Sequence, residues 1–320
     1  MDNITTIGID VAKNYLDICI MPFAKTLRVA NTKDGFNKLI KALQHHKDIF
    51  RIVLEHTGGY QKGVVAYLHE HQMPVSVINP SRARYFSKAN GQIAKTDMID
   101  AETLALFGLV HKPKLTEPED ESLVILRQLV HRRSQIVKMM ASEKNRMEKE
   151  PCSTVKKSIE HVLGFLEKEL KIIAEQIHAI VESDEGFQRK SEILQSVKGI
   201  GKESAAMLIS EVPELGLVGR QQISSLVGLA PMNRDSGNKK GQRYIQAGRK
   251  YARCALYMPI ISAIRYNPVI RAHYENLIGR GKAKKVALIA CMRKMLVHLN
   301  SLLAKEIYKD KEKIETFCLT

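Results

Sequence analysis

The first thirty residues constrain the fold most, because three short apolar runs follow one another there with only brief turns between them. Alternating and β-rich runs of this length predict strands, and the longer 3.6-period stretches that follow predict helices. The expected strands are 4–10, 15–20, 26–30, 51–55 and 75–78, and the expected helices are 33–46, 60–71, 82–90 and 98–110. Three consecutive strands followed by alternating helices and strands predict an α/β unit, a mixed sheet flanked by helices.

Four carboxylates fall at positions where this fold could bring them together. Asp10 ends the first apolar strand, and Glu55 ends the strand 51–55 just before a Gly-Gly turn. Asp97 and Asp100 open a helix, and residues three apart share one helix face. Each acid alone could be a solvated turn residue, and Asp97 after Thr96 could simply favour a helix start. Two strand-end acids and an i, i+3 pair together favour a metal site.

Clustered carboxylates repel one another and raise each other's pKa unless a cation neutralises them. Mg²⁺ prefers oxygen ligands at about 2.0–2.1 Å and keeps several waters, which leaves positions for phosphate oxygens. Two such ions roughly 4 Å apart can hold both oxygens of a phosphoryl displacement. The acids therefore predict Mg²⁺-dependent chemistry on a phosphodiester.

The charge balance predicts a polyanionic partner. The chain of 320 residues has 50 Lys and Arg against 34 Asp and Glu, a net charge of +16, and residues 187–320 hold 24 of the basic side chains but only 10 acids. The basic residues are spread over folded-looking segments, which disfavours an anionic membrane surface as the partner. Five scattered cysteines suggest neither disulfides nor zinc, and no signal peptide or run of about 18 apolar residues is present. We expect a cytoplasmic protein that does not bind a membrane.

A polar linker, 113–121, leads to a long helical region in which Pro151 separates two helices. In the second helix apolar residues follow a strict 4, 3 spacing: Ile159, Leu163, Leu166, Leu170, Ile173, Ile177 and Ile180. This spacing is typical of a coiled-coil seam. The region could be an antiparallel hairpin, a dimerisation arm or both, or one amphipathic helix against its own domain.

The C-terminal third is expected to be mostly helical and to bind nucleic acid. Residues 194–212 indicate a helix, a Gly-Ile-Gly turn and a second helix, similar to a helix-hairpin-helix element that binds phosphate through backbone N–H groups. A glycine-punctuated basic loop follows at 232–243, and 15 basic side chains but only two acids lie between 234 and 294. The expected nucleic-acid contacts are Gly199, Gly201, Lys202, Arg234, Lys239, Lys240, Arg243, Arg249, Lys282, Lys284 and Lys285.

Ser236 lies in that loop without a histidine close in sequence, so its local sequence alone indicates a turn serine. A serine beside arginines can nevertheless attack a phosphodiester, because guanidinium groups stabilise charge on the transferring phosphate.

Many short motifs occur in one order along the chain: IGIDVAK (7–13), LEHTG (54–58), VINP (77–80), KTD (95–97) with DA (100–101), GIG (199–201), GLAP (228–231), SG (236–237), ALYMP (255–259) and GKAKKV (281–286). Together they resemble the DEDD-type insertion-sequence transposases, the bridge-RNA-guided serine recombinases, whose relatives include the Piv-type DNA invertases. The resemblance implies an RNase H-like domain of the RuvC type with Asp10, Glu55, Asp97 and Asp100 as metal ligands. It implies that Ser236 attacks DNA to form a phosphoserine intermediate.

The same resemblance implies partners: donor and target DNA, a structured noncoding guide RNA, and further copies of the chain, as a dimer or as a tetramer when active, joined by the coiled coil. The sequence thus predicts a RuvC-like domain (1–115), a coiled-coil oligomerisation region (116–186) and a C-terminal domain with the serine (187–320). Rival interpretations are a Piv-like site-specific invertase, a RuvC-type nuclease that uses water as nucleophile, and a non-enzymatic nucleic-acid scaffold. An actin-like sugar kinase also begins with a strand ending Gly-x-Asp, but no later Gly-rich adenosine segment is found.

Overall fold

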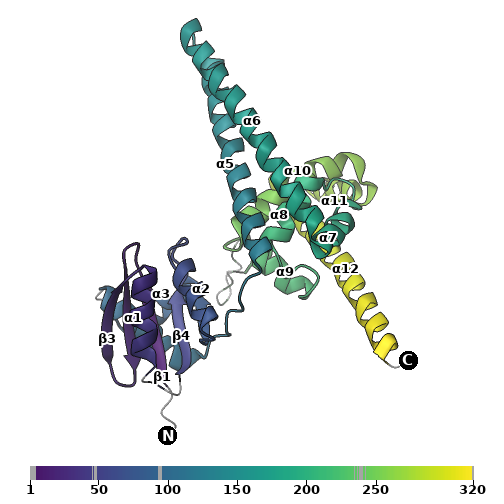
Figure 1. The fold of residues 1–320 in the computed structure, drawn as a ribbon. Helices are drawn as coiled ribbons and strands as arrows, with labels where there is room; N and C mark the ends of the chain where they lie inside the picture. Colours follow the sequence, from purple (N-terminus) through teal and green to yellow (C-terminus); the bar gives the residue numbers. More distant parts are fainter. Residues whose placement is uncertain are drawn as a thin grey trace. The chain divides into compact units, whose positions relative to one another are not determined.

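The computed structural model describes residues 5–44, 46, 49–92, 96–233, 235, 237, 241 and 243–318, with side chains as far as residue 308. These residues form two compact units, Met1–Glu119 and Asp120–Thr320. The first is an α/β unit and the second is almost entirely helical, as the sequence predicts (Figure 1).

The first unit contains one five-stranded mixed sheet. Its elements are β1 (Thr5–Val11), β2 (Tyr15–Met21), β3 (Lys25–Ala30), α1 (Lys33–Leu43), β4 (Ile49–Glu55), α2 (Lys62–Glu70), β5 (Val75–Ile78), α3 (Pro80–Ala89) and α4 (Asp97–His111). The strand order is β3-β2-β1-β4-β5; β2 is antiparallel to β1 and β3, whereas β4 is parallel to β1 and β5. The predicted elements are confirmed, with boundaries that shift by a few residues.

Alternation along β1 gives the sheet two different faces. Ile7, Ile9 and Val11 belong to a core shared with the buried residues of α1 and α2. Gly8 faces the other way, where a Cβ atom would lie only 2.0 Å from the backbone oxygen of Ala101 in α4. Helices α1 and α2 therefore cover one face, and α4 packs almost against the backbone of β1 on the other.

The predicted linker begins as part of this unit. Thr116 donates its backbone N–H to the carbonyl oxygen of Val75 (2.8 Å), and its hydroxyl oxygen accepts a hydrogen bond from the N–H of Val77 (2.8 Å). The Ser76 hydroxyl donates to the carbonyl oxygen of Lys114 (3.0 Å). The segment thus satisfies polar groups along β5, which would otherwise be an open edge.

The second unit consists of α5 (Glu121–Lys149), α6 (Ser153–Ser183), α7 (Glu185–Gln195), α8 (Lys202–Glu211), α9 (Arg220–Val227), α10 (Lys250–Tyr266), α11 (Pro268–Gly279) and α12 (Lys284–Cys318), with the two short strands β6 (Pro231–Met232) and β7 (Tyr244–Ile245). The sequence pattern does not predict β6 and β7. Helices α7 to α10 and α12, together with parts of α5, α6 and α11, supply the buried residues of one core.

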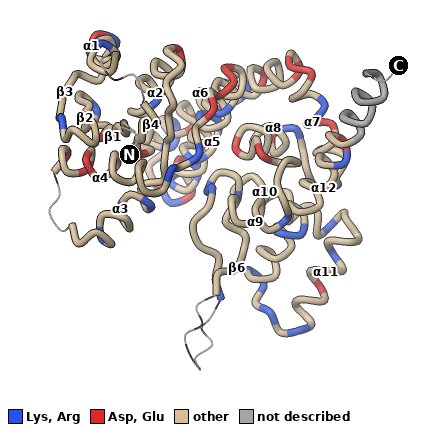
Figure 2. The backbone as a smooth tube through the Cα atoms, turned by 90° about the horizontal axis from the view of Figure 1, so that it is seen from below, with Lys and Arg blue, Asp and Glu red and all other residues tan. Residues whose placement is uncertain are grey.

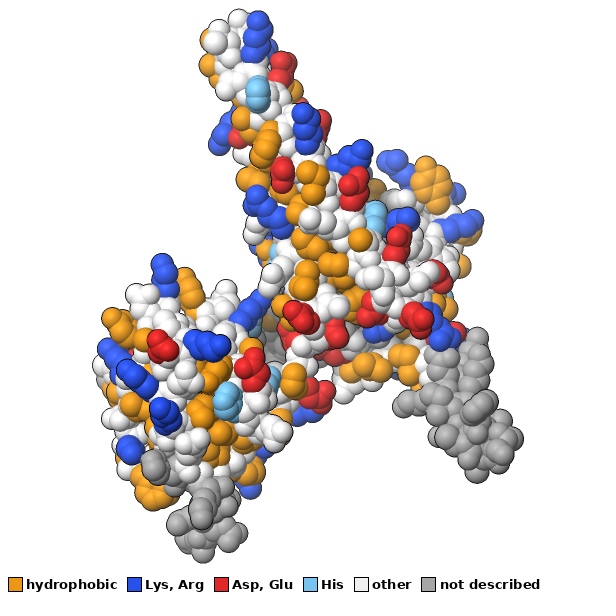
Figure 3. Space-filling model, in the orientation of Figure 1, with side chains coloured by type: hydrophobic (Ala, Val, Ile, Leu, Met, Phe, Trp, Pro, Cys, Tyr) orange, Lys and Arg blue, Asp and Glu red, His pale blue; other side chains and the backbone are white. Residues whose placement is uncertain are grey.

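Helices α5 and α6 form a long hairpin, and the chain leaves the helical conformation at Pro151, as predicted (Figure 1). The apolar seam of α6 is buried within the chain at Ile159, Leu163, Leu166 and Ile177. This arrangement is the antiparallel hairpin among the predicted alternatives. Hydrophobic side chains also remain exposed on α6, among them Phe165, and such side chains lie between charged ones along the hairpin in Figure 3.

Part of α12, Lys284–Tyr308, is the one helix of the described residues that is long and apolar enough to cross a membrane. Its apolar side chains include Cys291, Met295 and Leu299, which are almost completely buried in the core of the second unit. Part of this helix therefore packs in the core of the second unit.

Candidate active site

The sheet places Asp10 and Glu55 side by side. Asp10 lies two residues after Gly8 on β1 and therefore on the face that α4 covers. Val53 on β4 pairs with Gly8 and packs on the same face with residues of α4, so Glu55, two residues further on, also faces α4. Both carboxylates lie at the carboxyl ends of neighbouring parallel strands, as the sequence predicts.

Helix α4 brings the other two acids to this edge. Its N-cap is Thr96, whose hydroxyl oxygen accepts a hydrogen bond from the N–H of Ile99 (3.3 Å), and Asp97 and Asp100 occupy its first turn. The cap therefore exists alongside the acid pair and does not replace it. Because Gly8 allows α4 to approach the backbone of β1, the start of this helix lies near the ends of β1 and β4.

The electrostatics of Asp10 indicate that the other three carboxylates lie near it. Its pKa is raised from 3.8 to about 6, first because burial disfavours the charged carboxylate, and then because Asp100, Asp97 and Glu55 repel its charge. A mutual effect of this kind requires all three acids to lie close to Asp10. The four residues thus form one anionic site, which we call the acid cluster.

The donor set of the acid cluster suits a hard divalent cation, because it consists of carboxylate oxygens only. Among the residues that the structure describes, however, no three His, Cys, Asp or Glu side chains are arranged so that they would hold an ion as they stand. Within the acid cluster, Asp97 accepts a hydrogen bond from Arg28 (3.3 Å). The chemistry of the acid cluster fits Mg²⁺, while its side chains would have to rearrange to bind it.

Sequence reasoning missed two charged residues beside the acid cluster. Asp17 on β2 is 1% exposed and forms a two-pronged ion pair with Arg28 on β3, whose Nε and Nη2 donate to the two carboxylate oxygens (2.7 and 2.9 Å). A charged residue in the middle of the apolar strand YLDICI is the signal that could have found this pair.

Ser236 lies outside the described residues, as do Arg234, Lys239 and Lys240. The structure does describe the base of their loop, where β6 and β7 form an antiparallel ladder that pairs Met232 with Tyr244.

Two glycines make the base of this loop compact. A Cβ at Gly248 would lie 2.3 Å from the backbone nitrogen of Gly228, and both residues have positive φ, 72° and 74°. Arg253 adds a side-chain hydrogen bond to the carbonyl oxygen of Val227 (3.0 Å). The loop that contains the serine therefore starts from a fixed base.

The Gly-Ile-Gly turn joins α7 to α8, as predicted. Gly199 has φ 109°, and a Cβ there would lie 2.8 Å from the carbonyl oxygen of Pro259 in α10, so packing alone already requires a glycine. Gly201 is the N-cap of α8 and has no heavy atom within 4 Å of its Cβ position, and Lys202 beside it is exposed. The open N-terminus of α8 remains suited to phosphate contact.

The other predicted nucleic-acid residues fall into two groups. Arg243, Lys282, Lys284 and Lys285 are exposed. Lys and Arg positions recur along α10, α11 and the start of α12 in Figure 2, with few acids between them. Arg249 differs, because its guanidinium forms two hydrogen bonds to the Glu214 carboxylate (2.6 and 2.7 Å).

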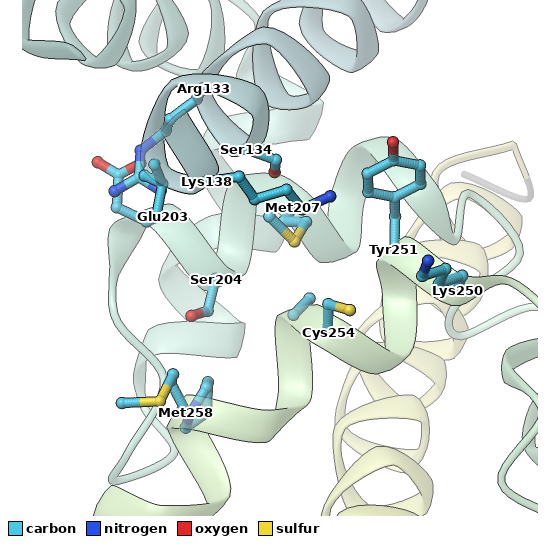
Figure 4. A pocket seen from close by; sticks show the side chains of 13 residues that line it. Arg133, Ser134, Lys138, Glu203, Ser204, Met207, Lys250, Tyr251, Cys254 and Met258 are labelled. Atoms are coloured by element: carbon cyan, nitrogen blue, oxygen red, sulfur yellow. The ribbon is translucent and has the colours of Figure 1, made fainter. Parts of the chain in front are cut away.

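A pocket of about 400 Å³ lies between α5, α8 and α10 in the second unit. Its lining combines apolar side chains such as Met207 and Met258 with the cationic Lys138 and Lys250 (Figure 4). Arg133 also lines it but is paired with Glu203 (2.6 Å). The remaining cations would favour an anionic or phosphate-bearing ligand at this pocket.

Comparison with known proteins covers most of the chain. Residues 7–150 match a DEDD-type (IS110) family model described as transposase, and residues 191–275 match the model described as transposase IS116/IS110/IS902 family. The chain is also 28% identical over 302 residues to the "Pilin gene-inverting protein" of Moraxella bovis and to that of Moraxella lacunata, which covers 91% of this chain and 93% of each relative.

Proposed function

Because this chain carries two transposase domains of the IS110 type and resembles the pilin gene-inverting proteins over nearly its whole length, we propose that it is an insertion-sequence recombinase that cuts and rejoins DNA through Ser236. The observation that best supports a phosphodiester substrate is the acid cluster, in which burial and three neighbouring carboxylates raise the pKa of Asp10. The more general assignment of the chain as a transposase or invertase rests on the family matches alone.

The first unit acts in this proposal as an RNase H-like domain of the RuvC type. Its strand order β3-β2-β1-β4-β5, with an antiparallel β-meander followed by parallel strands, supports that assignment. Asp10, Glu55, Asp97 and Asp100 would hold Mg²⁺, which supplies charge stabilisation to a phosphate when it is bound. The four acids would place the ion at the edge of the sheet, between the ends of β1 and β4 and the start of α4.

The second unit supplies the nucleophile and the phosphate contacts. The Oγ atom of Ser236 would bond to the phosphorus, the bond from phosphorus to a deoxyribose oxygen would break, and the serine proton would pass to a base while the leaving oxygen ends as a hydroxyl. Attack by a deoxyribose hydroxyl on the phosphoserine reverses these changes and joins a new strand.

The remaining predictions about partners belong to the same proposal. A guide RNA would pair with donor and target DNA, and the exposed basic residues of the second unit would hold its backbone. The protein would work as a dimer or tetramer in which one copy's acid cluster acts with another copy's serine. The exposed hydrophobic residues of α6 support further helix contacts along the hairpin.

The decisive experiment looks for DNA covalently attached to protein. The protein is purified with its bound RNA, incubated with Mg²⁺ and DNA that spans the element's junction, and analysed on a denaturing gel. An adduct that is lost in Ser236→Ala, but kept in Ser301→Ala, an exposed serine of α12, supports the proposal. Cleavage without an adduct that is unaffected by Ser236→Ala would instead establish a hydrolytic nuclease.

Site-specific inversion is the second candidate function, favoured by the similarity to two proteins named for inverting a pilin gene. A plasmid with the element's two junctions in inverted orientation distinguishes the candidates. Inversion of the intervening segment indicates an invertase, whereas excised circles and new insertions indicate a transposase.

A further inference from the structure

Three charged residues form a row across the sheet beneath the start of α4. Asp10 on β1 pairs in register with Asp17 on β2, and Asp17 pairs with Arg28 on β3. Residues directly opposite each other on antiparallel strands share a face, so all three lie on the face that α4 covers. The row runs from the acid cluster to the edge strand.

The Arg28 guanidinium is held firmly at one of its two contacts. Its bond to the buried Asp17 is two-pronged, at 2.7 and 2.9 Å, and Asp17 needs this cation because an unpaired buried carboxylate is costly. The second contact, from Nη2 to Asp97, is longer, at 3.3 Å, and joins side chains that are 52% and 62% exposed. Asp17 therefore anchors the arginine, and Asp97 is the partner that can leave.

This geometry has a consequence for the acid cluster. Arg28 brings a positive charge to one of four mutually repelling carboxylates, and it occupies an oxygen of Asp97 that a metal ion would use. A divalent cation at the acid cluster brings more charge than one guanidinium and can contact several carboxylates at once. The arginine and the metal ion thus compete for Asp97.

We propose that Arg28 is a positioning residue that, anchored on Asp17, holds Asp97 while the acid cluster lacks a metal ion and releases it when a divalent cation binds. The inference rests on the proposed metal role of the acid cluster. It identifies Arg28 and Asp17 as part of the site although neither belongs to the four acids.

The test measures Mn²⁺ binding to the metal-free full-length protein by titration calorimetry. In Arg28→Lys the ammonium keeps a charge for Asp17 but is a single point charge that cannot bridge both carboxylates. We expect Mn²⁺ to bind up to about fivefold more tightly, the equivalent of one exposed ion pair. In Arg28→Gln the gain should reach about tenfold, although loss of the partner of Asp17 lowers the melting temperature.

Two controls separate competition from a general effect of charge or packing. Lys25→Gln removes one positive charge from the same strand on its other face and should leave Mn²⁺ affinity unchanged. In an Asp97→Asn background Arg28→Lys should no longer tighten binding, because the competed ligand is gone. A merely structural arginine would give the same change in both backgrounds.

Weaker or equal Mn²⁺ binding by Arg28→Lys would overturn the inference, provided that Asp10→Asn abolishes binding and so places the ion at the acid cluster. If the wild-type protein binds no Mn²⁺, or if Asp10→Asn leaves binding unchanged, the proposed metal role of the acid cluster fails, and the inference fails with it.

Discussion

Replacing Asp10 by Asn should stabilise the metal-free protein at neutral pH, although Asp10 is a proposed metal ligand. Its pKa is about 6 in the folded chain against an ordinary value of 3.8, so the folded state binds a proton more tightly than the unfolded state does. The contribution of Asp10 to the free energy of unfolding is therefore most favourable below pH 4 and is lost as the pH rises through 6. The difference between the two pKa values corresponds to about 3 kcal/mol of folding free energy. Solvent screening at this half-buried position reduces that figure to about 2 kcal/mol.

The assay is scanning calorimetry of the full chain in EDTA between pH 4 and pH 8. The wild-type protein and Asp10→Asn should melt at the same temperature at pH 4. At pH 7 the melting temperature of the first unit should be roughly 10 °C higher in Asp10→Asn. Glu70→Gln, which neutralises an exposed acid of α2, should show no such pH-dependent gap. A gap that does not depend on pH, or a less stable Asp10→Asn at pH 7, would refute the reasoning.

Three further predictions follow from the site and its surroundings. Mn²⁺ affinity should fall about tenfold for each pH unit below about 6, because Asp10 must lose its proton to bind metal; a calorimetric titration at several pH values that shows a flat profile would contradict this. Gly8→Ala should lower the free energy of unfolding by about 3 kcal/mol or more and weaken Mn²⁺ binding, because its Cβ would lie 2.0 Å from the Ala101 oxygen. Chemical denaturation measures this loss, and Gly63→Ala, whose Cβ would meet nothing closer than 3.5 Å, is the matched control. Lys284→Ala with Lys285→Ala should reduce the salt dependence of DNA binding by a slope of about 2, measured by fluorescence anisotropy, whereas the exposed Lys168→Ala on α6 should not.

The sequence predicts the first unit well because its signals are local. Apolar alternation identifies the strands, and the acids Asp10 and Glu55 stand at their ends in any register that buries one face. The short strands β6 and β7 contain two residues each, too few for any periodic pattern. Their pairing joins two segments that are separated along the chain, which no local pattern specifies.

Contacts between distant residues account for most of what the sequence analysis missed. The Asp17–Arg28 pair depends on the register of β2 and β3, which no local pattern specifies. Arg249 is predicted to bind phosphate because it lies in a basic segment. In the structure its guanidinium forms a hydrogen bond to Glu214, 35 residues earlier in the chain. The heptad spacing of α6 predicts a partner helix but not that α5 of the same chain provides it.

The packing that builds the acid cluster also determines its electrostatic cost. Gly8 lets α4 approach β1 so closely that the helix N-terminus, with Asp97 and Asp100, lies beside Asp10. The positive end of the helix favours the two acids in its first turn, but Asp10 lies on a strand, and burial and three neighbours raise its pKa. The fold therefore makes a negative charge at Asp10 unfavourable while the site holds no cation. A cation that reaches Asp10 gains most by binding there, and it strengthens the same arrangement of β1, β4 and α4 that created the site.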